Sequence, residues 1–168
     1  MRMFFGRMNL DEAFEFLLNR KIIASEFKQA SKLINRLKGN DWRLWFGRFL
    51  LAVRSDADAN RFTAAYLCLL EAEALISEAK NTKEKEKFLS MINNESLFLE
   101  FKFCYEATGV ASVGLLMARA YYSGWGVKQN IPKAYEIAEK VVNSNTNDAI
   151  RSGAKELLAL ISSQTQQK

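Results

Sequence analysis

The sequence predicts an all-α protein, and three observations support this fold class. Apolar residues recur at spacings of three and four along nearly the whole chain, which is the period of an amphipathic helix. One proline and eight glycines in 168 residues are too few for the frequent turns of an all-β domain. Hydrophobic residues make up 49% and charged residues 26% of the chain, so it has enough apolar surface to fold around a core.

The first two helices are predicted from the residues at their ends. Asn9 and Glu12 have the spacing of a capping box, which indicates that a helix begins there. The apolar side of this helix consists of Leu10, Ala13, Phe14, Leu17 and Leu18. A second helix is expected from near Ser25 to Gly39, because a glycine commonly follows the last turn of a helix.

The middle of the chain predicts further helices. The first of these opens at Asn40–Asp41 and is apolar almost all round, which is typical of a central helix. The next is expected over about residues 59–80, and the charged run at 81–87 is either a connection or the start of another helix. Helical spacing of apolar residues continues on both sides of a break at Asn93–Asn94.

One stretch in the C-terminal third contains residues that end one helix and begin another. Gly124 can end a helix in the left-handed conformation, which costs other residues about 1–2 kcal/mol. Gly126 then allows a sharp turn. Asn130 can cap the next helix, and Pro132 suits its first turn because the missing N–H is not needed there. We expect Val127 to fill the space between the two antiparallel helices. Small residues would let these helices approach closely, namely Ala118, Ala120, Ala134 and Ala138.

Residues 113–142 resemble the Sel-one-like repeat, a relative of the tetratricopeptide repeat in which paired antiparallel helices stack into a superhelix. The resemblance is carried at unbroken spacing by Tyr121, Gly124, Gly126, Val127, Asn130, Lys133 and Ala134. The chain departs from the family pattern at Met117–Ala118, where the family has Leu-Gly, and at Val141–Val142, where it has an Ala-Ala pair. The resemblance implies antiparallel helix pairs stacked as a short right-handed α/α superhelix, and a bacterial setting.

We expect a single helical-repeat domain over residues 1–162. Within it, residues 113–142 are the recognisable repeat, and residues 147–162 form a helix that caps the stack, since terminal repeats are atypical. Residues 163–168 are expected to fray, because they are polar and lack apolar periodicity. Residues 1–110 are either diverged repeats or a helical bundle.

The residue types present argue against an enzyme. The chain contains no histidine, which removes the commonest general base and many zinc sites. Gly109 and Gly114 have the spacing of a phosphate-binding loop, but the Lys and Ser/Thr that such a loop needs are missing. Cys68 and Cys104 lie in apolar settings and predict reduced core thiols, with a disulfide between them as the alternative. We expect no catalysis, no metal and no cofactor.

The sequence favours binding of another protein, so that the chain would act as a scaffold or adaptor. The resemblance implies that the partner segment lies in the groove of the stacked helices. The residues expected to face it are Leu115, Arg119, Tyr122 and Trp125. The alternative is that Leu115 and Tyr122 pack on the preceding hairpin and that Trp125 covers its own hairpin. A narrower hypothesis is a bacterial immunity protein that occludes a toxin, and a secretion component is another candidate partner.

The runner-up function is nucleic-acid binding through the basic N-terminal third. Residues 1–55 carry 11 basic and 5 acidic side chains. The candidate phosphate contacts are Lys28, Lys32, Arg36, Arg43, Arg48 and Arg54. We favour solvated helix faces instead, because the charges are interspersed with apolar helical positions. The cluster at Trp42–Phe46 is likewise interpreted as core rather than as a platform on which bases stack.

The apolar runs of the chain are short. None approaches the ~20 residues that span a bilayer, and the first residues lack the apolar region of a signal peptide. We therefore expect no membrane span and a cytoplasmic protein.

Overall fold

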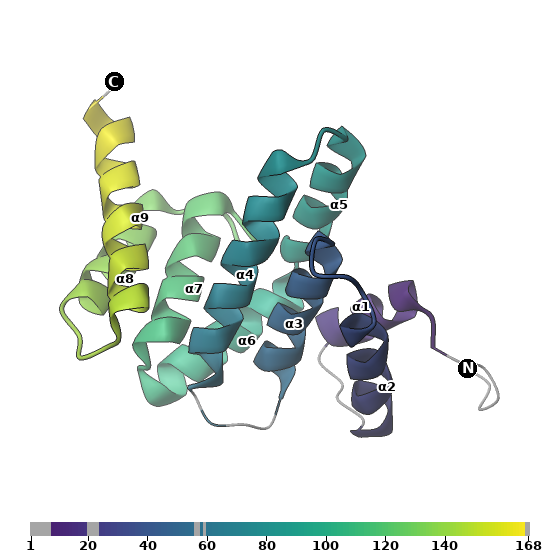
Figure 1. Ribbon diagram of the computed structural model, residues 1–168. Helices are drawn as coiled ribbons and strands as arrows, with labels where there is room; N and C mark the ends of the chain where they lie inside the picture. Colours follow the sequence, from purple (N-terminus) through teal and green to yellow (C-terminus); the bar gives the residue numbers. More distant parts are fainter. Residues whose placement is uncertain (1–7, 20–23, 56–57, 59, 167–168) are drawn as a thin grey trace. The chain divides into compact units, whose positions relative to one another are not determined.

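The computed structural model describes residues 8–19, 24–55, 58 and 60–166 (Figure 1). These residues form nine α-helices and no strand, which confirms the all-α prediction. The residue contacts divide the chain into two compact units. The first unit comprises Met1–Asp56 with Ala64–Phe88, and the second unit comprises Ala57–Thr63 with Leu89–Lys168. The expected single domain over residues 1–162 stays a prediction.

The first unit contains the N-terminal helices. The helices with residues in it are α1 (Leu10–Leu18), α2 (Ala24–Asn35), α3 (Trp42–Arg54), most of α4 (Arg61–Glu78) and most of α5 (Thr82–Ile92). Helix α1 packs on α2, α2 packs on α3, and α1 also contacts α3. The predicted capping box is confirmed: Asn9 Oδ1 accepts the N–H of Glu12 at 2.8 Å, and Glu12 Oε1 accepts the N–H of Asn9 at 3.1 Å.

An aromatic cluster forms the core of the first unit. Phe46 on α3 is completely buried, and its ring centroid lies 5.5 Å from that of Phe49 and 5.4 Å from that of Phe88. Trp42 is also buried and meets Phe88 edge to face, at 5.9 Å between centroids. Phe14 stacks on Phe46 from α1. The predictions that α3 is central and that its aromatic cluster is core are therefore confirmed.

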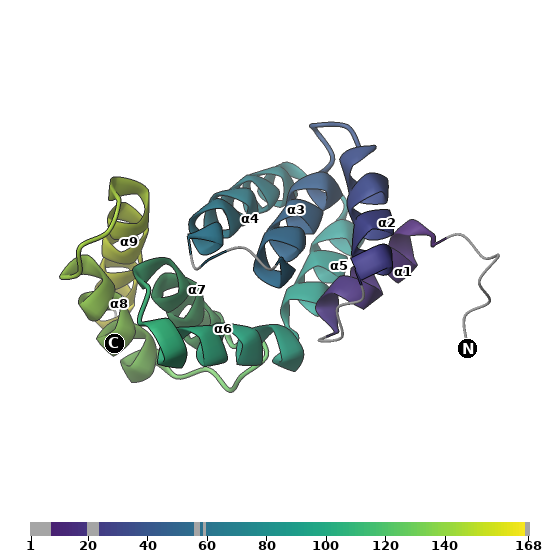
Figure 2. The ribbon, with the colours of Figure 1, turned by 90° about the horizontal axis from the view of Figure 1, so that it is seen from below.

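The second unit contains the C-terminal helices (Figure 2). They are α6 (Glu95–Thr108), α7 (Ala111–Ser123), α8 (Ile131–Val142) and α9 (Asp148–Gln166). Successive helices pack on one another, and α7 contacts both α8 and α9. The predicted helix over residues 147–162 is present as α9, but it continues to Gln166. Residues 163–166 are therefore helical rather than frayed, and residues 167–168 lie outside the described residues.

Three helix boundaries can be compared with the sequence predictions. Helix α2 ends at Asn35, and Gly39 lies in the following turn, where its carbonyl accepts the indole N–H of Trp45 at 2.9 Å. The charged run at 81–87 is mostly the start of α5, because the side chain of Asn81 caps the N–H of Lys83. The break at Asn93–Asn94 is confirmed.

Candidate partner-binding surface

The turn between α7 and α8 adopts the predicted conformation. Gly124 has a φ of 74° and donates its N–H to the carbonyl of Ala120 at 2.8 Å, which ends α7 in the left-handed region. Gly126 has a φ of 70°. Asn130 Oδ1 accepts the N–H of Lys133 at 3.0 Å, and Pro132 lies in the first turn of α8, so both ends of the connection are fixed.

This turn packs against the junction of α5 and α6. The N–H of Gly126 donates to Asn93 Oδ1 at 2.8 Å. A Cβ at Gly126 would collide with the carbonyl group of Asn94. The side chain of Asn94 in turn accepts the N–H of Leu97 at 2.9 Å and so caps α6. Gly126 is thus required for its positive φ and also for the close approach of the two turns.

Small residues let α7 and α8 pack closely. The completely buried alanines of this pair are Ala118, Ala120, Ala134 and Ala138. Tyr121 meets Phe98 of α6 edge to face, at 5.2 Å between centroids. Val127 is half-buried in the connection, and its filling of the space between the two helices stays a prediction.

The structure divides the four residues that were expected to face a partner. Leu115 is completely buried, so its assignment to the binding surface is wrong: this position of α7 faces the core of the helix pack. Arg119, Tyr122 and Trp125 are half-buried and keep part of their surface exposed. The Arg119 guanidinium lies 5.1 Å from the centroid of the Trp125 ring, so Trp125 covers a residue of its own hairpin.

Two exposed apolar residues on α6 were missed by the sequence analysis. Leu99 is 36% exposed and Phe103 is 64% exposed. They lie one helical turn apart, on the side of α6 opposite the buried residues Leu97, Phe98 and Phe101. We call Leu99 and Phe103 the α6 strip. The available signal was the i, i+4 spacing, but α6 is apolar over so much of its surface that the exposed side could not be distinguished from the buried one.

A second surface that was missed is an open groove between α8 and α9. It has a volume of about 550 Å³. The lining residues are Ile131, Pro132, Tyr135, Ile161, Ser162 and Thr165. Thr165 belongs to residues 163–168, which the sequence analysis had treated as a fraying tail.

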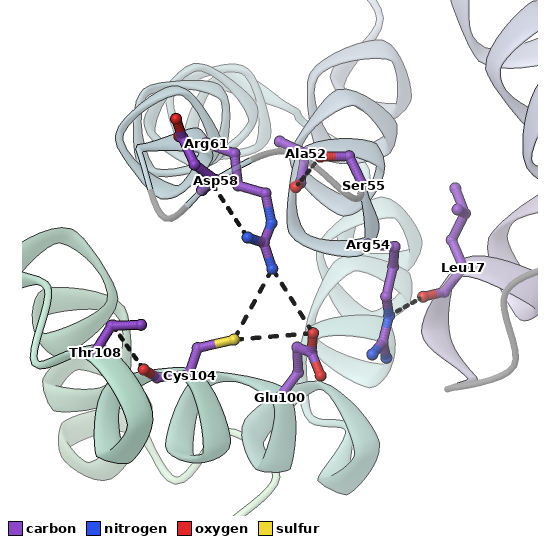
Figure 3. A network of polar contacts seen from close by, with 9 residues as sticks. All are labelled: Leu17, Ala52, Arg54, Ser55, Asp58, Arg61, Glu100, Cys104 and Thr108. Atoms are coloured by element: carbon purple, nitrogen blue, oxygen red, sulfur yellow. Dashed lines mark hydrogen bonds and ion pairs between the residues drawn. The ribbon is translucent and has the colours of Figure 1, made fainter.

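The six basic residues proposed for phosphate binding do not form one surface. Arg54 is buried and donates to the carbonyl of Leu17 at 2.8 Å, at the end of α1 (Figure 3). It also donates to the carbonyl of Leu18 at 2.9 Å. Its assignment as a phosphate contact is therefore wrong. Arg43 is paired with Asp41 at 2.8 Å. Arg48 donates to the Asn35 side chain at 3.1 Å and lies over Trp45. The other three basic residues are exposed: Lys28 and Lys32 lie on α2, and Arg36 follows its last residue.

A polar network in the second unit surrounds one of the cysteines. Arg61 lies 3.9 Å from both Cys104 Sγ and a carboxylate oxygen of Glu100, and it donates to the carbonyl of Asp58 at 3.1 Å (Figure 3). Burial raises the pKa of the Cys104 thiol, and the charge of Glu100 raises it further against the opposing effect of Arg61. This thiol is therefore neutral at pH 7, which does not suit a nucleophile.

Both cysteines are free thiols and are half-buried, so they are less enclosed than the sequence analysis expected. Burial also raises the pKa of the Cys68 thiol. Within the described part of the chain, no three His, Cys, Asp or Glu residues are grouped so that they could hold a metal ion. No helix in that part is long and apolar enough to cross a membrane.

Comparison with known proteins does not assign the chain to a family. A scan against protein-family models, a search of curated proteins and a search of solved structures each find no match. The function is therefore argued from the surfaces described above.

Proposed function

We propose that this protein is a helical-repeat scaffold that binds another protein through the exposed side of its second unit. The observation that carries the proposal is the α6 strip. Phe103 is 64% exposed, and full burial of such a side chain contributes about 1.5–3 kcal/mol. Leu99 lies beside it at i, i+4, so a partner could cover both side chains at once. Contiguous exposed apolar residues are typical of protein-binding surfaces.

The repeat architecture belongs to the same proposal. In stacked helical repeats each hairpin contacts its neighbours along the chain, and the first helix of a hairpin also packs on the first helix of the next. The contacts of α7 with both α8 and α9 agree with this pattern. So does the hydrogen bond from Gly126 to Asn93, because it joins the α7–α8 turn to the α5–α6 turn, which are the turns of two successive helix pairs. These contacts agree with stacked helix pairs, and the resemblance of residues 113–142 adds that such pairs form a short right-handed α/α superhelix.

The hairpin of α7 and α8 offers further contact residues. Arg119, Tyr122 and Trp125 are of the residue types that contribute most binding energy at interfaces. The guanidinium of Arg119 is already stacked on Trp125, so less side-chain freedom would be lost when a partner binds.

Site-specific photocrosslinking in the native cells tests this proposal. A photoreactive phenylalanine analogue replaces Phe103, and the matched control carries the analogue at Leu67, which is 44% exposed on α4. We expect one discrete protein adduct at position 103 and none at position 67. Adducts of equal yield at both positions, or none at position 103, would contradict the proposal.

A further inference from the structure

A second groove lies between the start of α1 and one side of α2, in the first unit. Its volume is about 290 Å³, and its lining residues are Met8, Gln29, Lys32, Leu33 and Arg36. Met8 is buried and Leu33 is half-buried, whereas Lys32 and Arg36 are exposed. The groove therefore has an apolar floor and a cationic rim. We call it the basic groove.

The cationic rim continues along α2. Lys28 and Lys32 are four residues apart, so they lie on one side of α2, about 6 Å apart along its axis, and Arg36 lies in the turn that directly follows Asn35. All three are exposed, and none has an ion pair or side-chain hydrogen bond to another described residue. The arginines of α3 differ, because Arg43 and Arg54 are held by Asp41 and by the end of α1. The charges of the rim are thus available to a partner.

We propose that the basic groove binds an acidic amphipathic helix of another protein. Carboxylates spaced four residues apart on such a helix would match the spacing of Lys28 and Lys32 on α2, and Arg36 would add a third cation at the end of the rim. An apolar side chain from the same helix would contact the floor formed by Met8 and Leu33. This surface belongs to the first unit, so the inference does not depend on the α6 strip.

The positive charge of the rim and the apolar floor favour an acidic helix over a nucleic acid or a second copy of this chain. A nucleic-acid backbone offers phosphates to the rim but no aliphatic group for an apolar floor. A second copy of this chain is disfavoured because the protein carries a net charge of +5, so that copies repel one another.

Peptide binding to the full-length protein tests the inference. The probe is a fluorescent helical peptide with glutamates four residues apart and leucines on the adjacent side. Two control peptides replace the glutamates by glutamine or the leucines by serine. We expect both controls to bind about tenfold more weakly, because each loses one of the two complementary features. A serine control that binds as well as the probe would overturn the role of the apolar floor.

Charge reversal locates the site. Lys28→Glu with Lys32→Glu is expected to weaken probe binding about tenfold or more, because attractive pairs become repulsive. The matched control, Lys80→Glu with Lys85→Glu, changes the net charge equally at exposed positions and is expected to leave binding within about twofold. Circular dichroism confirms that both variants fold.

Three outcomes would overturn the inference. Equal weakening in both double variants would show nonspecific attraction to a cationic protein. Binding of a single-stranded or duplex oligonucleotide that the Lys28 and Lys32 reversals abolish, without peptide binding, would assign the groove to nucleic acid. Sedimentation that shows dimers dependent on Lys28 and Lys32 would assign it to a second copy of the chain.

Discussion

The two ends of the chain each contain three consecutive helices in which the first contacts both others, but they are held together differently. In α7–α9 the connection is fixed by backbone conformation, through positive φ at Gly124 and Gly126. Helices α1–α3 are instead held together by side chains that are distant in sequence. These are the aromatic cluster around Phe46 and the hydrogen bonds of Arg54 to the end of α1. The first arrangement is encoded locally and the second is not.

The largest effect is expected at Gly126. Gly126→Ala places a side chain at positive φ and against the carbonyl of Asn94, so we expect a loss of about 3 kcal/mol in the free energy of unfolding. Gly124→Ala is the matched control. It has the same backbone constraint but no close neighbour, and should cost about 1 kcal/mol. Urea unfolding measures both variants, and equal losses would contradict the packing of the turn on Asn94.

Arg54→Met tests the side-chain contacts that hold α1 against α3. The variant keeps the aliphatic stem but leaves the carbonyls of Leu17 and Leu18 without their donor, at an expected cost of about 2 kcal/mol. Arg48→Met is the control, because Arg48 lies on α3 like Arg54 but its hydrogen bond, to Asn35 of α2, is exposed. It should lower the free energy of unfolding by less than about 0.5 kcal/mol. Similar midpoints of urea unfolding for the two variants would show that Arg54 does not hold α1 in place.

Removal of the N-cap at Asn130 is expected to have an intermediate effect. Asn130→Ala leaves the N–H of Lys133 without its acceptor and should lower stability by about 1 kcal/mol. Asn130→Asp keeps an acceptor at the same place and serves as the control, with a change near zero. If the aspartate variant were as unstable as the alanine variant, the side-chain cap would not explain the loss.

The smallest effect concerns the pH dependence of the cap on α3. Burial raises the pKa of Asp41, but the hydrogen bonds and charge of Arg43 together outweigh it and hold the pKa below its ordinary value of 3.8. The ionised cap therefore stabilises the fold above about pH 4, and this contribution is lost as the pH falls through the lowered pKa.

Asp41→Asn should be less stable than the parent chain by about 0.5 kcal/mol at neutral pH, because it keeps the cap but loses the charge. The difference should shrink below about pH 4. Thermal unfolding from pH 2 to pH 7 measures this difference in stability. A difference that does not change with pH would show that the charge of Asp41 does not cause it.

The contrast between the two ends also explains what the sequence could predict. Helix ends that depend on residues three or four positions apart were predicted and confirmed. They are the ends defined by the Asn9–Glu12 capping box, by Gly124 and by Asn130. Arg54 contacts Leu17 and Leu18 at the end of α1, which are 37 and 36 positions earlier in the chain. Nothing near Arg54 in the sequence indicates these contacts.

The candidate site was predicted only in part, for a related reason. Leu115, Leu99 and Phe103 all belong to helices with apolar residues on most sides. Periodicity shows which residues share a side of such a helix, but the neighbouring helices decide which side is covered. The structure places Leu115 in the core and leaves Phe103 exposed, and composition could not have distinguished them.

Titration with the partner identified by crosslinking measures the contribution of the α6 strip to binding. Phe103→Ser should weaken the affinity by about 2 kcal/mol, or roughly thirtyfold, because the proposal makes Phe103 a dominant contact. Leu67→Ser, an equally polar change at another exposed position, should leave the affinity unchanged. An unchanged affinity for Phe103→Ser, with the fold intact by circular dichroism, would contradict the claim.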